Sequence, residues 1–352
     1  MSGTGHLVIA LDAMGGDGAP EIVIRGAEIA RQRFPNVHFL IFGDEKAVRP
    51  RLDKVRKLAA ISTIVHSDEV VTNDMKPSLA LRAARRSSMR LAIDAVADGR
   101  AKGVVSAGNT GALMAMAKIV LRSLDGIDRP AIAAFLPTKR GETLALDLGA
   151  NIECDANNLV QFATMGAAFA NIALGVERPS VGLLNVGAEE LKGNDRVREA
   201  AAILKASDLP LVFHGFIEGD QVMSGIVDVV VTDGFTGNIA LKTVEGTSRL
   251  YTDFLRQAFR ASWRGRLSYL LARPVFRQLR ARVDPRRYNG AVFLGLNGVA
   301  VKSHGGTDAF GFANAVGLAI ELAAQGINDR IRESILRLTR KPDTDSGIAA
   351  TP

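Results

Sequence analysis

Short apolar runs, loops of glycine and small polar residues, and amphipathic stretches follow one another five times along the chain. Each stretch after a loop is rich in Ala and Leu. Such alternation is typical of a mainly parallel sheet that is covered by helices on both faces. The five runs with their loops are LVIAL with DAMGGDG, GVVS with AGNTG, VGLLN with VGAEELKGN, VDVVVT with DGFTGN and GVAVKS with HGGTD.

Other segments extend this pattern. Residues 37–45 and 62–67 read as strands, and residues 75–99 read as one long helix or a helix pair. No change in composition marks a linker, so the pattern predicts a single α/β domain over residues 1–340. Residues 341–352 are polar, and we expect them to be disordered. Since ligands bind at the carboxyl ends of the strands in parallel sheets, we expect all five loops to serve one cleft.

An insertion at about residues 250–283 departs from the α/β pattern and predicts an amphipathic helical hairpin. Its apolar residues recur at helical spacing and its arginines lie elsewhere, as in helices that bind a membrane interface. A hairpin that forms a dimer, with solvated arginines, fits equally well, and no known nucleic-acid module accompanies the basic residues. The candidate contact residues are Phe254, Phe259, Trp263, Arg264, Arg266, Phe276 and Arg277.

The charge of the chain is concentrated in the same region. The 352 residues carry a net charge of +7, but residues 256–287 alone hold ten arginines and one acid, so the remainder sums to −2. The basicity therefore predicts an acidic partner for this segment, either anionic lipid or an acidic protein, and not for the whole surface.

Composition excludes several classes of protein. No window approaches the roughly 20 continuous apolar residues of a membrane span, and the start lacks the layout of a signal peptide, which predicts a cytosolic protein. The single cysteine, Cys154, rules out an internal disulfide. No G-x-S-x-G motif or metal-ligand cluster is present, so we expect neither a covalent nucleophile, nor a metal ion, nor a cofactor.

The opening loop resembles a phosphate cradle but fits neither common fingerprint. Its glycines do not form G-x-G-x-x-G, no Gly-Lys-Ser/Thr follows, and Asp17 would repel a phosphate. Asp17 could instead cap the helix that begins near Pro20, while the glycines allow a tight turn. The loop is alternatively the first wall of a substrate cleft, formed by Asp12, Gly15, Gly16 and Asp17.

Two other loops are better anion sites, because each places small residues at the start of a helix, where free N–H groups favour anions. Lys192 and Lys302 could add positive charge or be solvated surface cations, and His304 and Asn185 lie in neighbouring loops. The two loops are formed by Ser106, Gly108, Asn109, Thr110 and Gly111, and by Asp233, Thr236, Gly237 and Asn238.

Eight motifs together make the chain similar to the PlsX family, the bacterial acyl-ACP:phosphate acyltransferases of phospholipid synthesis. The resemblance spans roughly residues 7–337. It is carried by ALDAMGGDGAP, VSAGNTGALMA, GIDRPAIA, LDLGAN, LNVGAEELKGN, GFIEGDQV, DVVVTDGFTGNIALK and LGLNGVAVKSHGGTDAFGFANAV.

This resemblance implies a Rossmann-like α/β fold related to the phosphotransacetylases and the isopropylmalate dehydrogenase group. It also implies a homodimer at the inner face of the cell membrane that converts long-chain acyl-ACP and inorganic phosphate into acyl-phosphate and ACP. An integral membrane acyltransferase would then use the acyl-phosphate. The chain departs from the family's usual Gly-Gly-Ala-Pro-Leu-Leu at YNGAVFL, where Asn289, Val292 and Phe293 stand. This departure puts the local loop geometry in doubt.

Phosphate is itself a competent nucleophile, because much of it is a dianion at neutral pH. Its second pKa lies near 6 to 7, close to the second pKa of roughly 6 that phosphorylated side chains have. We therefore expect catalysis by proximity, with phosphate held by the two anion loops and Lys302. Asn185 and Asn297 are candidates to stabilise the tetrahedral oxyanion, and His304 to protonate the leaving thiolate or only to order its loop. The alternatives are a short-chain phosphotransacetylase, a dehydrogenase on the same fold, or a non-catalytic protein of the membrane surface.

Overall fold

The computed structural model describes residues 6–339, without the side chains of residues 280–283 and 339. The tail predicted at 341–352 lies outside these residues. The helices of the described chain are α1 (Glu21–Arg33), α2 (Glu45–Leu52), α3 (Arg56–Ala59), α4 (Pro77–Ala83), α5 (Ser88–Ala97), α6 (Thr110–Leu121), α7 (Ala156–Leu174), α8 (Asp195–Ala206), α9 (Gly234–Arg260), α10 (Trp263–Leu271), α11 (Arg273–Val283), α12 (Ala309–Ala324) and α13 (Ile327–Thr339).

The strands form one continuous sheet, which has eleven strands within the described part of the chain. Its order is β3-β2-β1-β4-β11-β10-β5-β6-β9-β7-β8. The strands are β1 (Leu7–Asp12), β2 (Val37–Gly43), β3 (Ser62–His66), β4 (Gly103–Ser106), β5 (Ala131–Thr138), β6 (Gly141–Leu146), β7 (Ser180–Leu184), β8 (Val212–Ile217), β9 (Val229–Val231), β10 (Ala291–Leu294) and β11 (Val299–Lys302).

Strand direction reverses across the middle of the sheet. The pairs β11/β10, β10/β5 and β5/β6 are antiparallel, and the other neighbouring pairs are parallel. The mainly parallel sheet is therefore confirmed. However, β1, β4 and β11 end at one edge of the sheet, here the first edge, whereas β6, β7 and β9 end at the opposite, second edge. The expectation that all five loops serve one cleft is wrong within a single chain.

Helices cover both faces of the sheet, as the continuous apolar strands predict. Along β1, Ile9 and Leu11 point into a core that α1, α7, α8, α12 and α13 share, while Ala10 points into a second core with α4, α5 and α6. The segment 75–99 is thus a helix pair, α4 and α5. This two-sided burial fixes the strand ends, and hence the loops at both edges.

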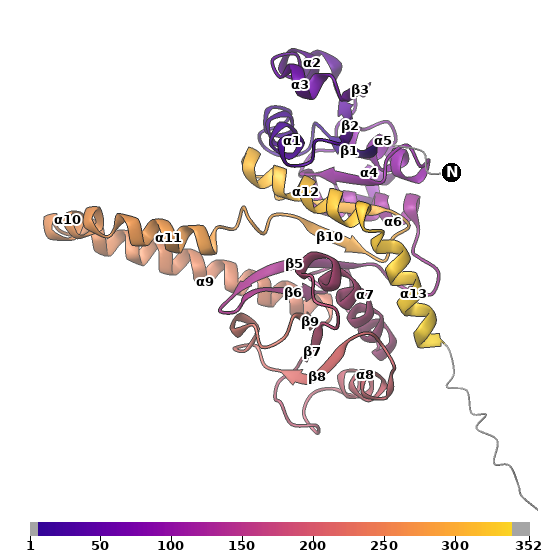
Figure 1. The fold of residues 1–352 in the computed structure, drawn as a ribbon, viewed down its shortest axis with the longest axis vertical. Helices are drawn as coiled ribbons and strands as arrows, with labels where there is room; N and C mark the ends of the chain where they lie inside the picture. The colour runs from indigo at the N-terminus through magenta and orange to yellow at the C-terminus, as the bar shows by residue number, and fades with distance from the viewer. Residues whose placement is uncertain (1–5, 340–352) are drawn as a thin grey trace, which may run out of the picture.

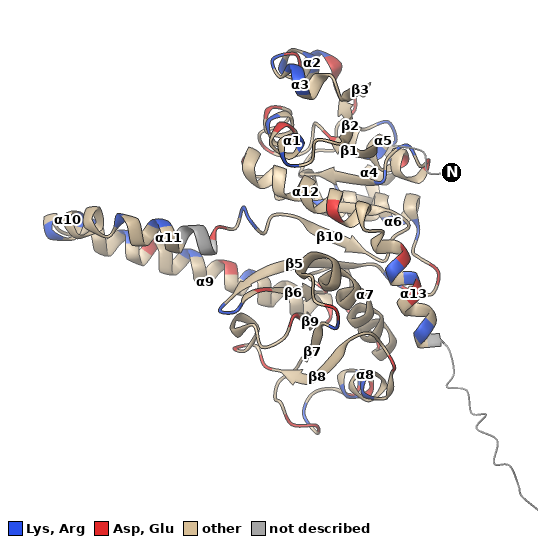
Figure 2. Ribbon diagram, in the orientation of Figure 1, with Lys and Arg blue, Asp and Glu red and all other residues tan. Residues whose placement is uncertain are grey.

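The predicted hairpin is present as an arm that projects from the body of the molecule (Figure 1). α9 is continuous from the sheet edge to Arg260, and α10 and α11 lead back toward β10. Figure 2 shows Lys and Arg residues along α10 and α11. No single described helix is long and apolar enough to cross a membrane, and α12 and α13 meet that test only together, as a pair bent by 56°.

Aromatic side chains hold the arm together at its far end. The ring of Phe259 lies 5.5 Å from that of Tyr269 and 5.2 Å from that of Phe276, and Tyr269 lies 5.4 Å from Phe276. Phe259 and Phe276, which we expected on the contact surface, are therefore half-buried inside the hairpin. Phe254 and Trp263 are 55% and 70% exposed, so they remain candidates for contact with a partner.

Candidate functional site

The loops after β1, β4 and β11 meet at the first edge around the carboxylate of Asp12. One oxygen of Asp12 accepts hydrogen bonds from Ser88 Oγ at 2.6 Å and from the Met14 N–H at 3.2 Å. The other oxygen accepts from Ser106 Oγ at 2.6 Å, and Ser106 Oγ in turn accepts from the Gly108 N–H at 3.0 Å. Burial raises the pKa of Asp12, while the bonds from Ser106 and Ser88 oppose this shift. Asp12 and Ser106 are fully buried and order the loops.

Gly15 and Gly16 let these loops approach each other. A Cβ on Gly15 would lie 2.6 Å from Asp12 Oδ2 and 2.6 Å from the Gly108 nitrogen, and Gly16 has a φ of +96°. These two glycines therefore allow close packing of backbone against backbone, and their contact with a substrate stays a prediction.

Asp17 does not cap α1, because the first residues of that helix have no side-chain cap. Its carboxylate instead accepts a hydrogen bond of 3.3 Å from the Asn73 side chain, and its N–H donates to the Gly305 carbonyl at 3.0 Å. Asp17 therefore joins the opening loop to the loop after β11.

Lys302 lies between these loops, at the end of β11. Its ammonium group donates to the carbonyls of Ala107, at 3.4 Å, and of Ser303. Burial lowers the pKa of Lys302 to about 8, although the negative charges of Asp12 and Asp17 oppose the shift. A lysine with a pKa near neutrality, at the carboxyl edge of a sheet, is typical of a functional site.

His304 follows Lys302 and is exposed. Its Nδ1 accepts a hydrogen bond of 3.1 Å from the Gly306 N–H, which assigns the proton of the neutral ring to Nε2. The exposed Nε2–H can therefore donate to a bound anion or to a leaving group.

Asn289 fixes the backbone of this loop. Its side-chain oxygen accepts from the His304 N–H at 2.9 Å, and its amide donates to Ser303 Oγ and to the Gly311 carbonyl, both at 2.8 Å. The side chain of Asn289 thus joins the linker after α11 to the loop that carries Lys302.

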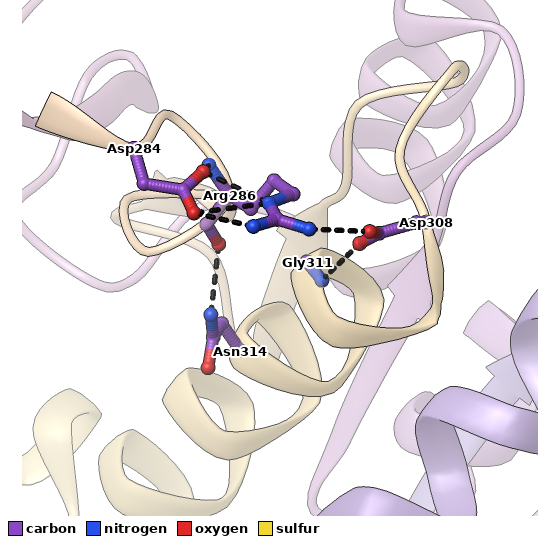
Figure 3. A network of polar contacts seen from close by, with 5 residues as sticks. All are labelled: Asp284, Arg286, Asp308, Gly311 and Asn314. Carbon is purple, nitrogen blue, oxygen red and sulfur yellow. Dashed lines mark hydrogen bonds and ion pairs between the residues drawn. The ribbon is translucent and has the colours of Figure 1, made fainter. Parts of the chain in front are cut away.

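A second set of contacts clamps the same linker to the start of α12 (Figure 3). Arg286 donates to Asp284 at 2.6 Å and to Asp308 at 2.7 Å, and its carbonyl accepts from the Asn314 side chain at 2.8 Å. Asp308 also accepts from the Gly311 N–H at 3.0 Å, so the residue that caps α12 is also the ion-pair partner of Arg286.

The loop after β4 leads into the start of α6, where Asn109 caps the helix by accepting a 3.0 Å hydrogen bond from the Ala112 N–H. The side-chain amide of Asn109 donates to the carbonyls of Thr72, Asn73 and Met75, at 3.3, 3.0 and 2.9 Å. Thr110 is exposed at the first turn of α6, and Gly111 faces Pro77, which would lie 2.7 Å from an added Cβ.

The loop after β9 lies at the second edge and also caps a helix. Asp233 accepts hydrogen bonds from the N–H of Thr236 at 2.9 Å and from its hydroxyl at 2.8 Å. Gly237 packs against Asp147, whose carbonyl oxygen would lie 1.9 Å from a Cβ, and Asn238 lies beside Gly149. Thr236 and Asn238 are exposed at the start of α9.

Two other candidates lie away from Lys302. The amide of Asn185 donates to the carbonyls of Gly187 and Lys192, at 3.2 and 3.1 Å, in the loop after β7 at the second edge. Asn297 precedes β11, so it lies at the opposite end of that strand, where its side chain donates to Ser123 O at 2.8 Å. The structure therefore does not bring Asn185 or Asn297 together with Lys302 within one chain.

A pocket of about 370 Å³ opens at the second edge. Cys154 lines it, but burial and the nearby charge of Asp147 raise the pKa of this thiol to about 11. The pocket is lined by Ile152, Glu153, Cys154, Leu159, Asn194, Arg196, Val197, Asp233, Phe235 and Thr236. Over the described residues, no group of His, Cys, Asp and Glu is suited to hold a metal ion.

Sequence reasoning missed two residues that organise these edges. Ser88 acts through a hydrogen bond to Asp12, which lies 76 residues away in the chain, and the sequence carries no signal for such a contact. Asp147 lies in the LDLGAN motif, and its buried carboxylate accepts from the N–H groups of Ile132 and Asn151, at 2.9 and 2.7 Å. An acid directly after an apolar strand and before Gly-Ala-Asn was the available signal.

Solved structures support the fold. The phosphotransacetylase from Streptococcus pyogenes superposes with a TM-score of 0.61 at 18% identity, covering 91% of this chain and 94% of that one. The branched-chain phosphotransacylase from Enterococcus faecalis gives 0.58 at 14% identity, covering 90% and 99%. At such identities the likeness concerns the fold alone.

Sequence comparisons identify the family. Residues 7–330 match the fatty acid synthesis protein family. The phosphate acyltransferase of Rhodospirillum centenum is 62% identical over 330 residues, which cover 94% of this chain and 93% of that one. The phosphate acyltransferase of Paramagnetospirillum magneticum is 57% identical over 344 residues, 98% of each chain. The chain therefore belongs to the fatty acid synthesis protein family and, within it, to the phosphate acyltransferases.

Proposed function

We propose that the chain transfers a long-chain acyl group from acyl carrier protein to inorganic phosphate, and that the reaction takes place at the first edge. The observation that carries this proposal is the partly buried ammonium group of Lys302, with its pKa of about 8, between the loops after β1, β4 and β11. A cation there offsets the cost of placing a phosphate dianion beside a thioester.

In the proposed reaction, a phosphate oxygen attacks the thioester carbonyl carbon to form a tetrahedral oxyanion. When the tetrahedral oxyanion collapses, the new C–O bond is kept and the C–S bond breaks. The products are acyl-phosphate and the carrier's thiolate. Lys302 holds the phosphate together with the exposed first turn of α6 at Thr110. The Nε2–H of His304 stabilises the oxyanion or protonates the thiolate, whose pKa lies near 8.5.

The direct test mixes purified protein with palmitoyl-ACP and phosphate and measures free ACP and acyl-phosphate. Phosphate-dependent release of both is the expected result. If His304→Ala and Lys302→Ala both keep near-full rates, the assignment to the first edge fails. If the rate of Lys302→Ala still saturates with increasing phosphate concentration, the phosphate binds elsewhere. The candidate is then an anion site at the second edge, formed by Thr236, Gly237 and Asn238 with Lys192.

A short-chain acyl-CoA donor is the alternative, since two solved structures with a similar fold are a phosphotransacetylase and a branched-chain phosphotransacylase. Comparing rates with acetyl-CoA and palmitoyl-ACP separates the two. A preference for acetyl-CoA would overturn the long-chain proposal and leave the phosphate chemistry in place.

We also propose that the arm of α9, α10 and α11 brings a homodimer to the cytoplasmic face of the cell membrane, near the acyltransferase that uses acyl-phosphate. The exposed apolar residues Phe254 and Trp263, beside Arg264, Arg266 and Arg277, support contact with anionic lipid. Flotation with vesicles that contain anionic lipid tests the contact, and sedimentation at several concentrations tests the dimer.

A further inference from the structure

A basic surface lies beside the first edge, outside the loops described above. It consists of Lys76, Leu79, Arg82, Arg85 and Arg86, on and around α4, and is called the α4 face here. All five side chains are exposed, and Leu79 is 53% exposed. With Asp74 as the one acid of residues 72–86, this segment carries a net charge of +3.

The cations of the α4 face have no acidic partner among the side chains that the structure describes. By contrast, Arg90 on the adjoining α5 pairs with Asp94 at 2.8 Å, and Arg31 on α1 pairs with Glu28 at 2.7 Å. Four cations without an acidic partner, in the same segment as an exposed leucine, form a surface that is complementary to an acidic protein with an apolar contact.

The α4 face is attached directly to the candidate site. The amide of Asn109 holds the carbonyls of Asn73 and Met75, just before α4, and Asn73 donates to Asp17. Pro77, the first residue of α4, packs on Gly111 at the start of α6. A protein docked on α4 would therefore lie next to the loops that surround Lys302, whereas the arm projects away from the body (Figure 1).

We infer that the α4 face is the docking surface for an acidic protein that carries the acyl thioester. The inference rests on the proposed function and adds to it the place where the donor binds. Charge on the docking surface raises the rate of encounter, and Leu79 would add a short-range apolar contact.

The test compares two double variants with equal change of charge. Arg82→Glu/Arg85→Glu reverses the α4 face, and Lys54→Glu/Arg56→Glu reverses exposed cations on and just before α3. α3 precedes β3, so it lies at the opposite edge from the carboxyl ends of the parallel strands around β1. Arg86 is left unchanged, because the Glu69 carboxylate lies 3.0 Å from its backbone nitrogen and would repel a glutamate introduced there.

Steady-state kinetics are measured with palmitoyl-ACP and with palmitoyl-pantetheine, which lacks the protein. We expect the α4 variant to raise KM for palmitoyl-ACP about tenfold, by loss of electrostatic steering, with unchanged kcat and an unchanged KM for palmitoyl-pantetheine. The α3 variant should match wild type. Equal KM values for palmitoyl-ACP in all three proteins, or an equal rise in both variants, would overturn the inference.

Binding of fluorescent holo-ACP, measured without phosphate, separates this inference from the proposed reaction. If wild type binds holo-ACP but forms no acyl-phosphate, the proposed reaction is wrong. The docking surface then still stands, provided that the α4 variant binds holo-ACP more weakly than wild type. Absence of binding by wild type rejects the docking surface. A changed oligomeric state of the α4 variant would also reject the docking surface, because the α4 face would then be a subunit interface. A KM raised for acyl-CoA alone would reject it too, because the face would then contact a nucleotide.

Discussion

The side-chain oxygen of Asn289 accepts a 2.9 Å hydrogen bond from the backbone N–H of His304. Because the same side chain also donates to Ser303 and Gly311, a single residue of the linker after α11 positions the backbone between Lys302 and α12. We expect Asn289→Gly to lower kcat about 10- to 100-fold through misplacement of this loop, with little change in KM for the acyl donor.

The matched control for this prediction is Asn314→Ala. Asn314 donates to the carbonyl of Arg286 in the same linker but does not contact the Lys302 loop in any described bond. It should keep kcat close to wild type. Equal kcat in Asn289→Gly and wild type would show that the loop holds its geometry without Asn289.

Lys302 should impose a limit on activity at alkaline pH. Its folded pKa of about 8 means that the ammonium is present below pH 8 and is lost as the pH rises through that value. We therefore expect kcat/KM for phosphate to fall above about pH 8, and Lys302→Arg, if active, to lose this alkaline limb, since arginine stays charged. An identical alkaline limb in Lys302→Arg would assign the titration to another group.

Cys154 should be inert in the native protein. The side chain is 5% exposed and its pKa is raised to about 11, so about one thiol in a thousand is ionised at pH 8. Alkylation by iodoacetamide should be very slow before unfolding and fast in denaturant, and Cys154→Ser should keep acyl-phosphate formation. Rapid alkylation with loss of activity would place the thiol near the reaction.

The two kinds of aromatic residue in the arm should respond differently to substitution. Phe276→Ala removes two ring contacts, worth about 1–3 kcal/mol together, so we expect faster hydrogen exchange in α10 and α11. Phe254→Ala and Trp263→Ala remove exposed side chains, so they should reduce vesicle flotation without changing hydrogen exchange. Flotation that depends only on Phe276 would mean that arm folding, and not an exposed apolar face, controls lipid contact.

The sequence predicted both the covered sheet and the hairpin, because apolar runs and helical spacing are local signals. It also placed Lys302, Asn109 and His304 at strand ends that do meet. The reversal of strand direction was missed, since it depends on how β5, β6 and β10 pair. The short segment Lys139–Arg140–Gly141 between two apolar runs was the local signal for an antiparallel hairpin, and Gly141 has a φ of +133° there.

The placement of polar side chains was harder to predict, because it depends on contacts between distant segments. Ser106 was expected to face a ligand, yet its hydroxyl donates a hydrogen bond to Asp12, which lies 94 residues away in the chain. Asn185 and Asn297 have the right chemistry for an oxyanion site, but the strand order separates both from Lys302 within one chain. Residue type predicts what a group can do, whereas the fold decides which groups act together.

The continuity of α9 has a structural consequence. Its 27 residues form one hydrogen-bonded rod of about 40 Å, at 1.5 Å per residue, with the Asp233 cap at one end and Arg260 at the other. Asp233, Phe235 and Thr236 at this helix's first turn also line the second-edge pocket. The rim of that pocket and the outer end of the arm are therefore parts of one continuous helix.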